Sequence, residues 1–372
     1  MTVTKITLSI FALSLILNSN ALGQSPKYRS EKLVPVATFG DRRPIGVKVS
    51  STNRLFVSFP NRGASYKYGL VEIRNGREVP FPDDTWNSNI GDPKQHFVNV
   101  QDLYIDTDDK LWVLDSKPSS GGSIFGNDGG MPAQGYFKLV KINLKTNTVD
   151  KVYTFDDLDK ARSGLNDIRI DTEKGLGYLS DPGQAAIVIL DLVSGKTRTV
   201  LKQQPFTVAD TSVVLSYEGV EMRDKDGKPF RSNINGIAIT RDNKYLYFKA
   251  INQLHLYRIE TRYLADAKLN AEALASHVQD VGIVGITHGL EADKKGNIFL
   301  TTSTDYAIKY ITPDGKLNTL VQDSRIIWPD SMGIGSDGFL YFSCAQLNRD
   351  PQWNNGQNNT ELPYTVYKVK LP

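Results

Sequence analysis

The feature that most constrains the fold is a short phrase that returns six times along the chain: a turn, a polar residue, an alternating strand, an Asp or Gly turn, and a second strand. The copies begin at Arg43, Asn99, Gly164, Asn233, Ile286 and Trp328. Each copy predicts a β-hairpin whose apolar residues alternate, so each has a face that it cannot bury alone. A repeat of about 40 to 70 residues, with room for four short strands, is typical of propeller blades. We therefore predict an all-β fold, a six-bladed β-propeller with one or two short helices in the insertions between blades.

The two ends of the repeat region predict how the ring closes. Residues 32–39 and 364–371 both alternate between apolar and polar side chains. If they pair within one shared blade, no open sheet edge remains. Because the repeat continues unbroken to Cys344, we expect residues 24–372 to form a single domain.

The first residues differ in character from the rest. Residues 1–5 carry a positive charge, residues 6–17 are apolar, and residues 21–23 are small or apolar, as at a cleavage site. This pattern predicts a secretory signal peptide over residues 1–23 and a secreted or periplasmic protein. An uncleaved anchor is the alternative, but the apolar stretch is shorter than the roughly 20 residues that span a bilayer. No later segment has the length and hydropathy of a membrane span.

Charge and cysteine content narrow the functional classes further. The 44 basic and 41 acidic residues are interspersed and contain no basic run, which argues against a nucleic-acid surface. Cys344 is the single cysteine, so no intramolecular disulfide can form. Its apolar surroundings predict a small buried side chain, with a reactive thiol as the alternative.

Three long insertions interrupt the repeat. Residues 116–136 are rich in Gly and Ser and predict a lid or binding loop. Residues 208–230 alternate and contain an Asp-Gly turn, which predicts a flap hairpin. Residues 260–280 carry apolar side chains at helical spacing and predict one helix against the outside of the ring.

The residues that precede the inner strands converge at the propeller axis. This register contains Ile45, Gln101, Asn166, Asn235, His288 and Asp330. Amide and carboxylate oxygens from separate blades suit a hard cation, because calcium takes six to eight oxygen ligands. We predict Asn166, Asn235 and Asp330 as ligands of Ca²⁺ or another divalent cation, and no organic cofactor.

Other side chains of the axis predict catalysis or ligand contact. His288 titrates near neutral pH and Asp330 is a carboxylate, so both are candidate catalytic residues. Contacts with a small-molecule ligand are predicted for Gln101, Asp102, Asp167 and Trp328. The alternative is local turn chemistry, since Asn and Asp at strand starts often bond their own backbone. For Asp106, Asp171 and Asp293, which come later in the phrase, we favour the turn interpretation.

Several stretches resemble the yellow/major royal jelly protein family over nearly all of the mature chain. They are RLFVSFPN (54–61), VPFPDDTWN (79–87), LYIDTDDKLWVLD (103–115), LNDIRID (165–171), GYLSD (177–181), GIAIT and YLYF (236–248) and WPD (328–330). The resemblance implies a secreted six-bladed propeller. It also implies dopachrome-type conversion in some members and binding of small aromatic amines in others. The chain lacks the disulfide cysteines of the insect members, and a bacterial exported member is expected.

A more distant resemblance is to gluconolactonase/regucalcin propellers, which hold calcium or zinc at the axis through a Glu, two Asn and an Asp. Asn166 and Asn235 match the two Asn positions, whereas Ile45 and His288 stand at the Glu and Asp positions. The resemblance implies that Asp330 of the next blade replaces the missing carboxylate.

Three functions remain open from the sequence. The first is an enzyme acting on a small carbonyl compound, a metal-assisted lactonase or a tautomerase. The second is a protein that binds such a molecule without turnover. The third is a protein-interaction platform whose axis is only structural.

Overall fold

The structure is a computed structural model that describes residues 28–372 apart from residues 62–65, 89 and 117–136. The predicted signal peptide over residues 1–23 lies outside the described residues, as does nearly all of the insertion at 116–136.

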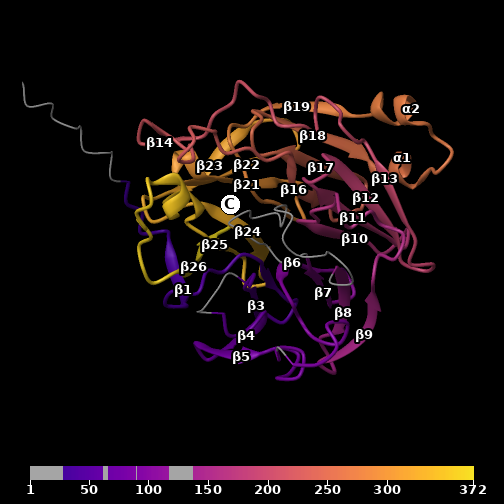
Figure 1. Cartoon of the computed structure of the whole chain (residues 1–372), viewed down its shortest axis with the longest axis horizontal. Helices are drawn as coiled ribbons and strands as arrows, with labels where there is room; N and C mark the ends of the chain where they lie inside the picture. The colour runs from indigo at the N-terminus through magenta and orange to yellow at the C-terminus, as the bar shows by residue number, and fades with distance from the viewer. Residues whose placement is uncertain (1–27, 62–65, 89, 117–136) are drawn as a thin grey trace, which may run out of the picture.

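Six four-stranded antiparallel sheets surround one axis, as the sequence repeat predicts (Figure 1). Each sheet is one blade, and each copy of the repeated phrase supplies its two inner strands. The first three blades are β2 (Val47–Val49), β3 (Leu55–Ser58), β4 (Leu70–Arg74) and β5 (Arg77–Pro80); β6 (Val100–Ile105), β7 (Lys110–Asp115), β8 (Lys138–Asn143) and β9 (Thr148–Tyr153); and β10 (Ile168–Asp171), β11 (Leu176–Asp181), β12 (Ala186–Asp191) and β13 (Thr197–Val200).

The remaining blades follow the same order, except that the sixth is shared between the chain ends. They are β16 (Ile234–Ile239), β17 (Tyr245–Ala250), β18 (His255–Glu260) and β19 (Gln279–Ile283); β20 (Leu290–Ala292), β21 (Ile298–Thr302), β22 (Ala307–Ile311) and β23 (Leu317–Gln322); and β24 (Pro329–Ile334), β25 (Phe339–Cys344), β26 (Thr365–Lys370) and β1 (Val34–Thr38). The antiparallel pairing of β1 with β26 confirms the predicted closure.

Turn chemistry shapes the inner hairpins. The Asp106 carboxylate accepts the backbone N–H groups of Asp108 and Lys110, both at 2.9 Å. Asp293 accepts the N–H groups of Lys295 and Asn297 in the same way, at 2.8 and 2.9 Å. The turn interpretation of these Asp residues is therefore confirmed.

The inner strands of neighbouring blades contact one another around the whole ring. They approach so closely that a Cβ on Gly236 would lie 2.1 Å from the carbonyl oxygen of His288, and one on Gly289 would lie 2.0 Å from that of Asp330. Serine hydroxyls also link the blades. Ser58 Oγ donates to Gln101 O at 3.1 Å, and Ser343 Oγ donates to Ile45 O at 2.6 Å. These contacts fix where the residues before each inner strand meet.

The two described insertions have different outcomes. Residues 213–230 form the predicted flap, with β14 (Ser216–Tyr217) paired to β15 (Val220–Glu221). Residues 260–280 were expected to form one helix and contain two short ones, α1 (Thr261–Ala265) and α2 (Ala271–Ala275), which agrees with the one or two short helices predicted for the insertions. Asn270 separates them: its side chain accepts the N–H of Ala273 and caps α2. Both helices lie at the periphery of the ring (Figure 1).

Short 3-10 turns shape two loops on the side of the ring where the inner strands begin. They are η1 (Ser303–Asp305), η2 (Leu347–Arg349) and η3 (Pro351–Trp353). Cys344 is 2% exposed and packs in the core of the sixth blade, as expected for a small buried side chain. Within the described part of the chain, no helix combines the length and hydropathy needed to cross a membrane.

Candidate functional site

A small cavity lies at the axis, and five of the six predicted register residues line it, four of them with polar side chains. The lining residues are Ile45, Gln101, Asn166, Asn235, Ile251, Trp328, Asp330 and Leu347, which we call the axial cup. The cavity volume is about 10 Å³, close to the minimum that holds one water molecule. The cup is thus a closed site with a mixed polar and apolar wall.

Two amides of the cup bond to each other. Gln101 Nε2 donates to Asn166 Oδ1 at 3.1 Å, and Asn166 Nδ2 donates to Asp167 Oδ1 at 2.7 Å. Asn166 is therefore held on both sides. Asn235, by contrast, is 8% exposed and has no side-chain hydrogen-bond partner among the described residues. Its amide is the polar group of the cup that is available to a ligand.

Trp328 forms one wall of the cup in a strained conformation. Its backbone φ is 47°, in the left-handed region that bulky residues seldom adopt. The side chain is 1% exposed, and its Nε1 donates to Asp330 Oδ2 at 3.3 Å. Strain of this kind persists only where the surrounding structure imposes it, and it concentrates at functional sites. The strain therefore marks this wall as a functional candidate.

His288 does not line the cup, although its register position predicted that it would. Its imidazole lies behind Trp328, with ring centroids 4.0 Å apart, and its Nε2 hydrogen-bonds to Ser303 Oγ at 2.6 Å. Its Nδ1 has no hydrogen-bond partner. Burial, together with the nearby Lys249 charge, lowers the pKa of His288 to about 3. His288 is therefore neutral and sealed from the cup at ordinary pH, which does not support the predicted catalytic role.

Asp102 and Asp167, predicted as ligand contacts, lie one layer deeper along the axis and do not line the cup. Asp102 Oδ2 accepts Arg169 Nη1 at 3.0 Å and the N–H of Ile168 at 3.1 Å. Burial and the like charges of Asp102 and Asp330 raise the pKa of Asp167 well above its usual range, against the opposing effect of Arg169. Asp167 is therefore a buried neighbour of Asp330 whose protonated form is favoured relative to that of an exposed Asp.

A buried ion pair fills the axis below these carboxylates. Lys48 Nζ lies 2.7 Å from Glu291 Oε2, and both residues are 4% exposed. Burial by itself would raise the pKa of Glu291, but the Lys48, Arg241 and Arg169 charges hold it below its usual value. This layer closes the axial channel beneath the cup.

The fourth blade departs from the hydroxyl pattern at the axis. The last or next-to-last residue of the second strand carries a hydroxyl that accepts an inner-strand N–H in four blades, namely Ser58, Ser180, Thr301 and Ser343, whereas Leu114 stands there in the second blade. Lys249 occupies this place in β17, and its amine donates to the carbonyl groups of Ala250 and Gln253. Burial lowers the pKa of Lys249 to about 7.

The donor set of the cup does not fit a calcium ion. Asp330 is its one carboxylate, and the Asn166 oxygen already accepts a hydrogen bond. Among the described residues, no three His, Cys, Asp or Glu side chains gather as metal ligands do. Calcium takes six to eight oxygens, usually including several carboxylates. The predicted ligands Asn166, Asn235 and Asp330 do meet at one cavity, but they supply too few oxygens by themselves.

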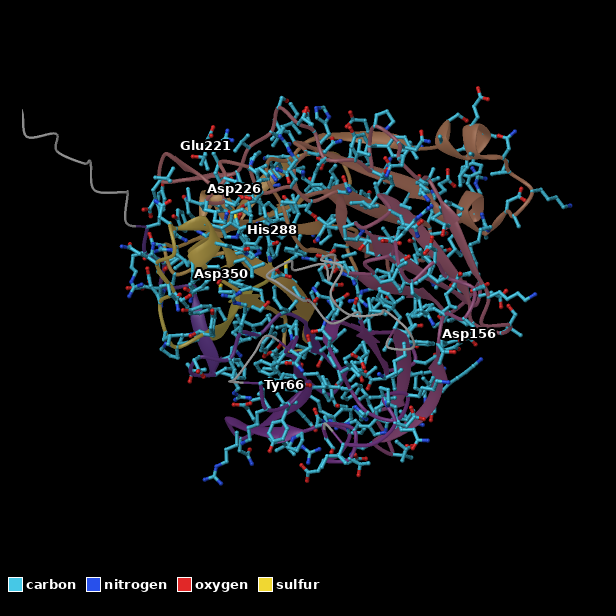
Figure 2. All side chains as sticks on the ribbon, viewed as in Figure 1. Tyr66, Asp156, Glu221, Asp226, His288 and Asp350 are labelled. Carbon is cyan, nitrogen blue, oxygen red and sulfur yellow. The ribbon has the colours of Figure 1, made fainter. Side chains whose placement is uncertain are left out.

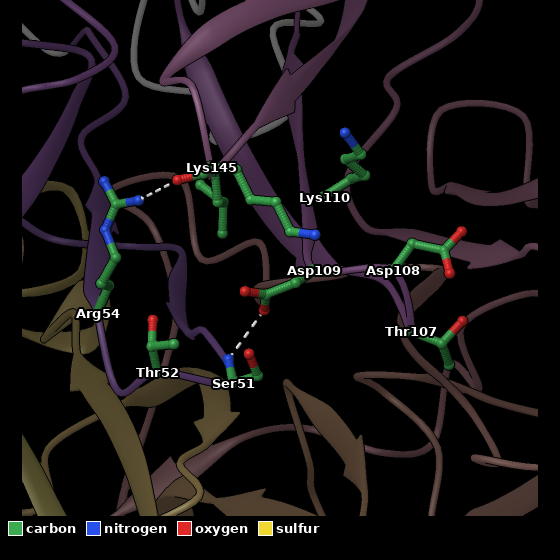
Figure 3. Close-up of a pocket in the computed structure, with 9 residues that line it drawn as sticks. Ser51, Thr52, Arg54, Thr107, Asp108, Asp109, Lys110 and Lys145 are labelled. Carbon is green, nitrogen blue, oxygen red and sulfur yellow. Dashed lines mark hydrogen bonds between the residues drawn. The ribbon is translucent and has the colours of Figure 1, made fainter.

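A second cavity lies far from the predicted residues, between turns of the first two blades (Figure 3). It measures about 780 Å³ and is lined mainly by polar groups from residues 51–54, 107–110 and 144–145. Two of its lining residues are already bonded across it: Asp109 accepts the N–H of Ser51 at 2.8 Å, and Arg54 donates to Leu144 O at 2.5 Å.

Sequence reasoning missed Ile251 and Leu347, which also line the cup. Both lie in loops between the second and third strands of their blades, outside the repeated phrase. No periodic signal marks such positions, so the sequence offered no way to find them.

Comparison with known proteins gives the family. A family model described as "Major royal jelly protein" matches residues 98–357, well over half of the 372 residues. The chain belongs to the major royal jelly protein family. No curated protein sequence matches this family member.

Solved structures resemble this major royal jelly protein family member in fold. A luciferin-regenerating enzyme is 12% identical, with 91% of this chain and 94% of that chain covered and a TM-score of 0.54. Virginiamycin B lyase from Staphylococcus aureus is 15% identical, with 91% and 99% covered and a TM-score of 0.50. At these identities the likeness shows the propeller fold alone.

Proposed function

We propose that this protein binds a small carbonyl-containing molecule in the axial cup without converting it. The observation that carries the proposal is the position of His288 behind Trp328, because among the described residues it leaves Asp330 as the one titratable side chain that lines the cup. Acid–base turnover ordinarily needs a donor and an acceptor within reach of the substrate. Recognition needs less: an apolar wall and a few convergent polar groups.

Each wall of the cup has a role in this proposal. The Asn235 amide donates to the carbonyl oxygen of the ligand, and Asp330 accepts from a hydroxyl or amine. Trp328 presents an aromatic surface, while Ile45 and Ile251 exclude water from these hydrogen bonds. Since the cavity holds at most about one water molecule, the cover of the cup must move before a ligand enters.

A catalytic alternative has one observation in its favour. Burial and the like charges of Asp102 and Asp330 raise the pKa of Asp167, so a carboxyl group with a perturbed pKa lies beside Asp330. In this alternative Asp330 removes a proton next to the carbonyl group, or activates water against a lactone. The sequence resemblance to lactonases and to dopachrome-converting proteins points to the same two reactions.

One experiment separates the two functions. The purified mature protein is titrated with glucono-δ-lactone and with a dopachrome-type quinone, and both binding and product formation are followed. Binding predicts saturation without product, weakened about tenfold or more by Asn235→Leu and by Asp330→Asn through loss of a buried hydrogen bond. His255→Gln, on the outer surface, is the matched control. If product forms and Asp330→Asn abolishes it, the protein is an enzyme instead. If both variants bind as tightly as the wild type, the cup is not the binding site.

We also propose that the protein is exported and loses residues 1–23. The support is the charge and hydropathy pattern of these residues. N-terminal sequencing of the protein recovered outside the producing cells' cytoplasm tests this. A mature chain starting at Gln24 is the expected result, and a retained Met1 contradicts it.

A further inference from the structure

The flap, residues 213–230, is anchored at its base by one side chain. Asn252 is fully buried, and its Nδ2 donates to Val213 O and to Phe230 O, both at 3.0 Å. Its Oδ1 accepts the N–H of Ser232 at 2.8 Å. Both ends of the flap therefore bond to the residue that follows the cup residue Ile251. This arrangement fixes the base while leaving the hairpin as the part that can move.

The underside of the flap is continuous with the wall of the cup. Leu215, Met222 and Phe230 are between 0% and 5% exposed. They belong to one apolar cluster with four cup residues, namely Ile45, Ile251, Trp328 and Leu347. The Phe230 ring meets the Trp328 ring edge to face, with centroids 5.4 Å apart. The flap thus lies on the strained tryptophan that walls the cup.

The tip of the flap is held by two side-chain hydrogen bonds to the fifth blade. Tyr217 Oη and Ser303 Oγ are 2.8 Å apart, and Tyr306 Oη donates to Glu218 Oε1 at 2.9 Å. Ser303 is also the partner of His288. We call these two hydrogen bonds the latch. Beyond the latch the hairpin faces solvent, and Val220 is 69% exposed. Glu221 and Asp226 lie toward the outer edge of the molecule, while His288 lies nearer its centre (Figure 2).

We infer that the flap is a gate for the axial cup, hinged at Asn252 and latched through Tyr217–Ser303 and Glu218–Tyr306. This inference rests on the proposed function, in that it regulates entry to the same cup. Opening separates Leu215, Met222 and Phe230 from Trp328 and exposes the cup wall. The blades need not move, because the hinge and the latch belong to loops between strands. Local opening of this kind is typical of segments held by few contacts.

Thiol labelling tests the gate without any ligand. Ile251→Cys places a thiol in the cup wall, and its reaction with iodoacetamide is followed by peptide mass spectrometry. Cys344, which is 2% exposed in the sixth blade, reports global unfolding in the same sample. The latch is broken by Tyr217→Phe with Tyr306→Phe, which removes both phenol hydroxyl groups. The matched control is Glu221→Gln with Asp226→Asn, on the same hairpin but outside the latch.

Breaking the latch is expected to raise the labelling rate at position 251 about tenfold, through loss of two hydrogen bonds, while labelling of Cys344 stays the same. The control pair should leave both rates unchanged. If the labelling rate at position 251 is the same in the latch and control variants, the gate is overturned. It is also overturned if that rate and the labelling rate of Cys344 rise together, because this would indicate global unfolding. If Ile251→Cys does not fold, Ile45→Cys supplies the thiol on another wall. The labelling experiment uses no ligand. A negative labelling result would therefore rule out the gate but not ligand binding, and a negative binding result would leave the gate to be tested by labelling.

Discussion

The indole of Trp328 stacks on the imidazole of His288, with ring centroids 4.0 Å apart and planes inclined by 25°. Trp328 faces the cup, and His288 lies on its other side. The stack therefore makes the histidine a support for the cup wall. Its Nε2 bond to Ser303 connects this support to the latch of the flap.

Acid should destabilise the protein through His288. Its pKa of about 3 in the folded state lies below the usual 6.5, because burial disfavours the charged form. The unfolded chain therefore binds a proton more readily, and stability present at pH 7 is lost as the pH falls below 6.5. The His288 contribution to the free energy of unfolding should fall by about 2 kcal/mol between pH 7 and pH 5. Urea denaturation at both pH values measures it.

The variant His288→Gln removes this titration and should reduce the acid sensitivity by that amount. His255→Gln is the matched control, since the His255 side chain is 39% exposed and pairs with Asp280. Equal acid sensitivity in the wild type and in His288→Gln would show that His288 is charged in the folded protein.

Alkaline conditions should stabilise the protein through Lys249. Its folded-state pKa of about 7 lies below the usual 10.5, so the folded chain releases the proton first. Stability therefore increases as the pH rises from 7 toward 10.5, by about 2 kcal/mol between pH 7 and pH 9. Lys249→Met should flatten this slope in urea denaturation, whereas Lys225→Met, at an exposed turn of the flap, should not. An unchanged slope in Lys249→Met contradicts the assignment.

The close approach of the inner strands predicts a severe effect of one added methyl group. In Gly289→Ala the new Cβ would lie 2.0 Å from the carbonyl oxygen of Asp330, a backbone atom that cannot rotate away. We expect a loss of about 3 kcal/mol in the free energy of unfolding. Gly177→Ala is the control, because its nearest neighbour would be a side-chain atom at 3.4 Å. Similar losses in both variants would mean that the axis can widen.

The fold could be predicted from the sequence because each blade repeats the same local physics. The alternation of residues 32–39 and 364–371 even predicted the pairing of β1 with β26. The helical insertion was predicted less well, since apolar spacing alone did not show that Asn270 would cap a new helix. Local signals thus gave the type of each element and its place in the ring, but not every boundary.

For the site, the sequence predicted which positions meet at the axis, but not how their side chains are oriented. Gln101, Asn166, Asn235 and Asp330 do meet at the cup, as positions before inner strands should. The side chain of His288, however, turns toward Ser303, and the sequence contains no signal for that rotamer. The flap contacts also could not be foreseen, because they join residues from separate blades through loops that lie outside the repeat.

Calcium should leave the thermal stability unchanged. A ligand present at 100 times its Kd and binding only the folded state stabilises by about 2.7 kcal/mol, which a melting curve resolves easily. The cup offers one carboxylate, from Asp330, and the Asn166 oxygen is already bonded to Gln101, so we expect the same Tm in millimolar CaCl₂ and in chelator. Asp330→Asn is the paired variant. A Tm raised by calcium in the wild type but not in Asp330→Asn would show that the cup rearranges around a metal, since the side chains as they stand cannot complete its coordination.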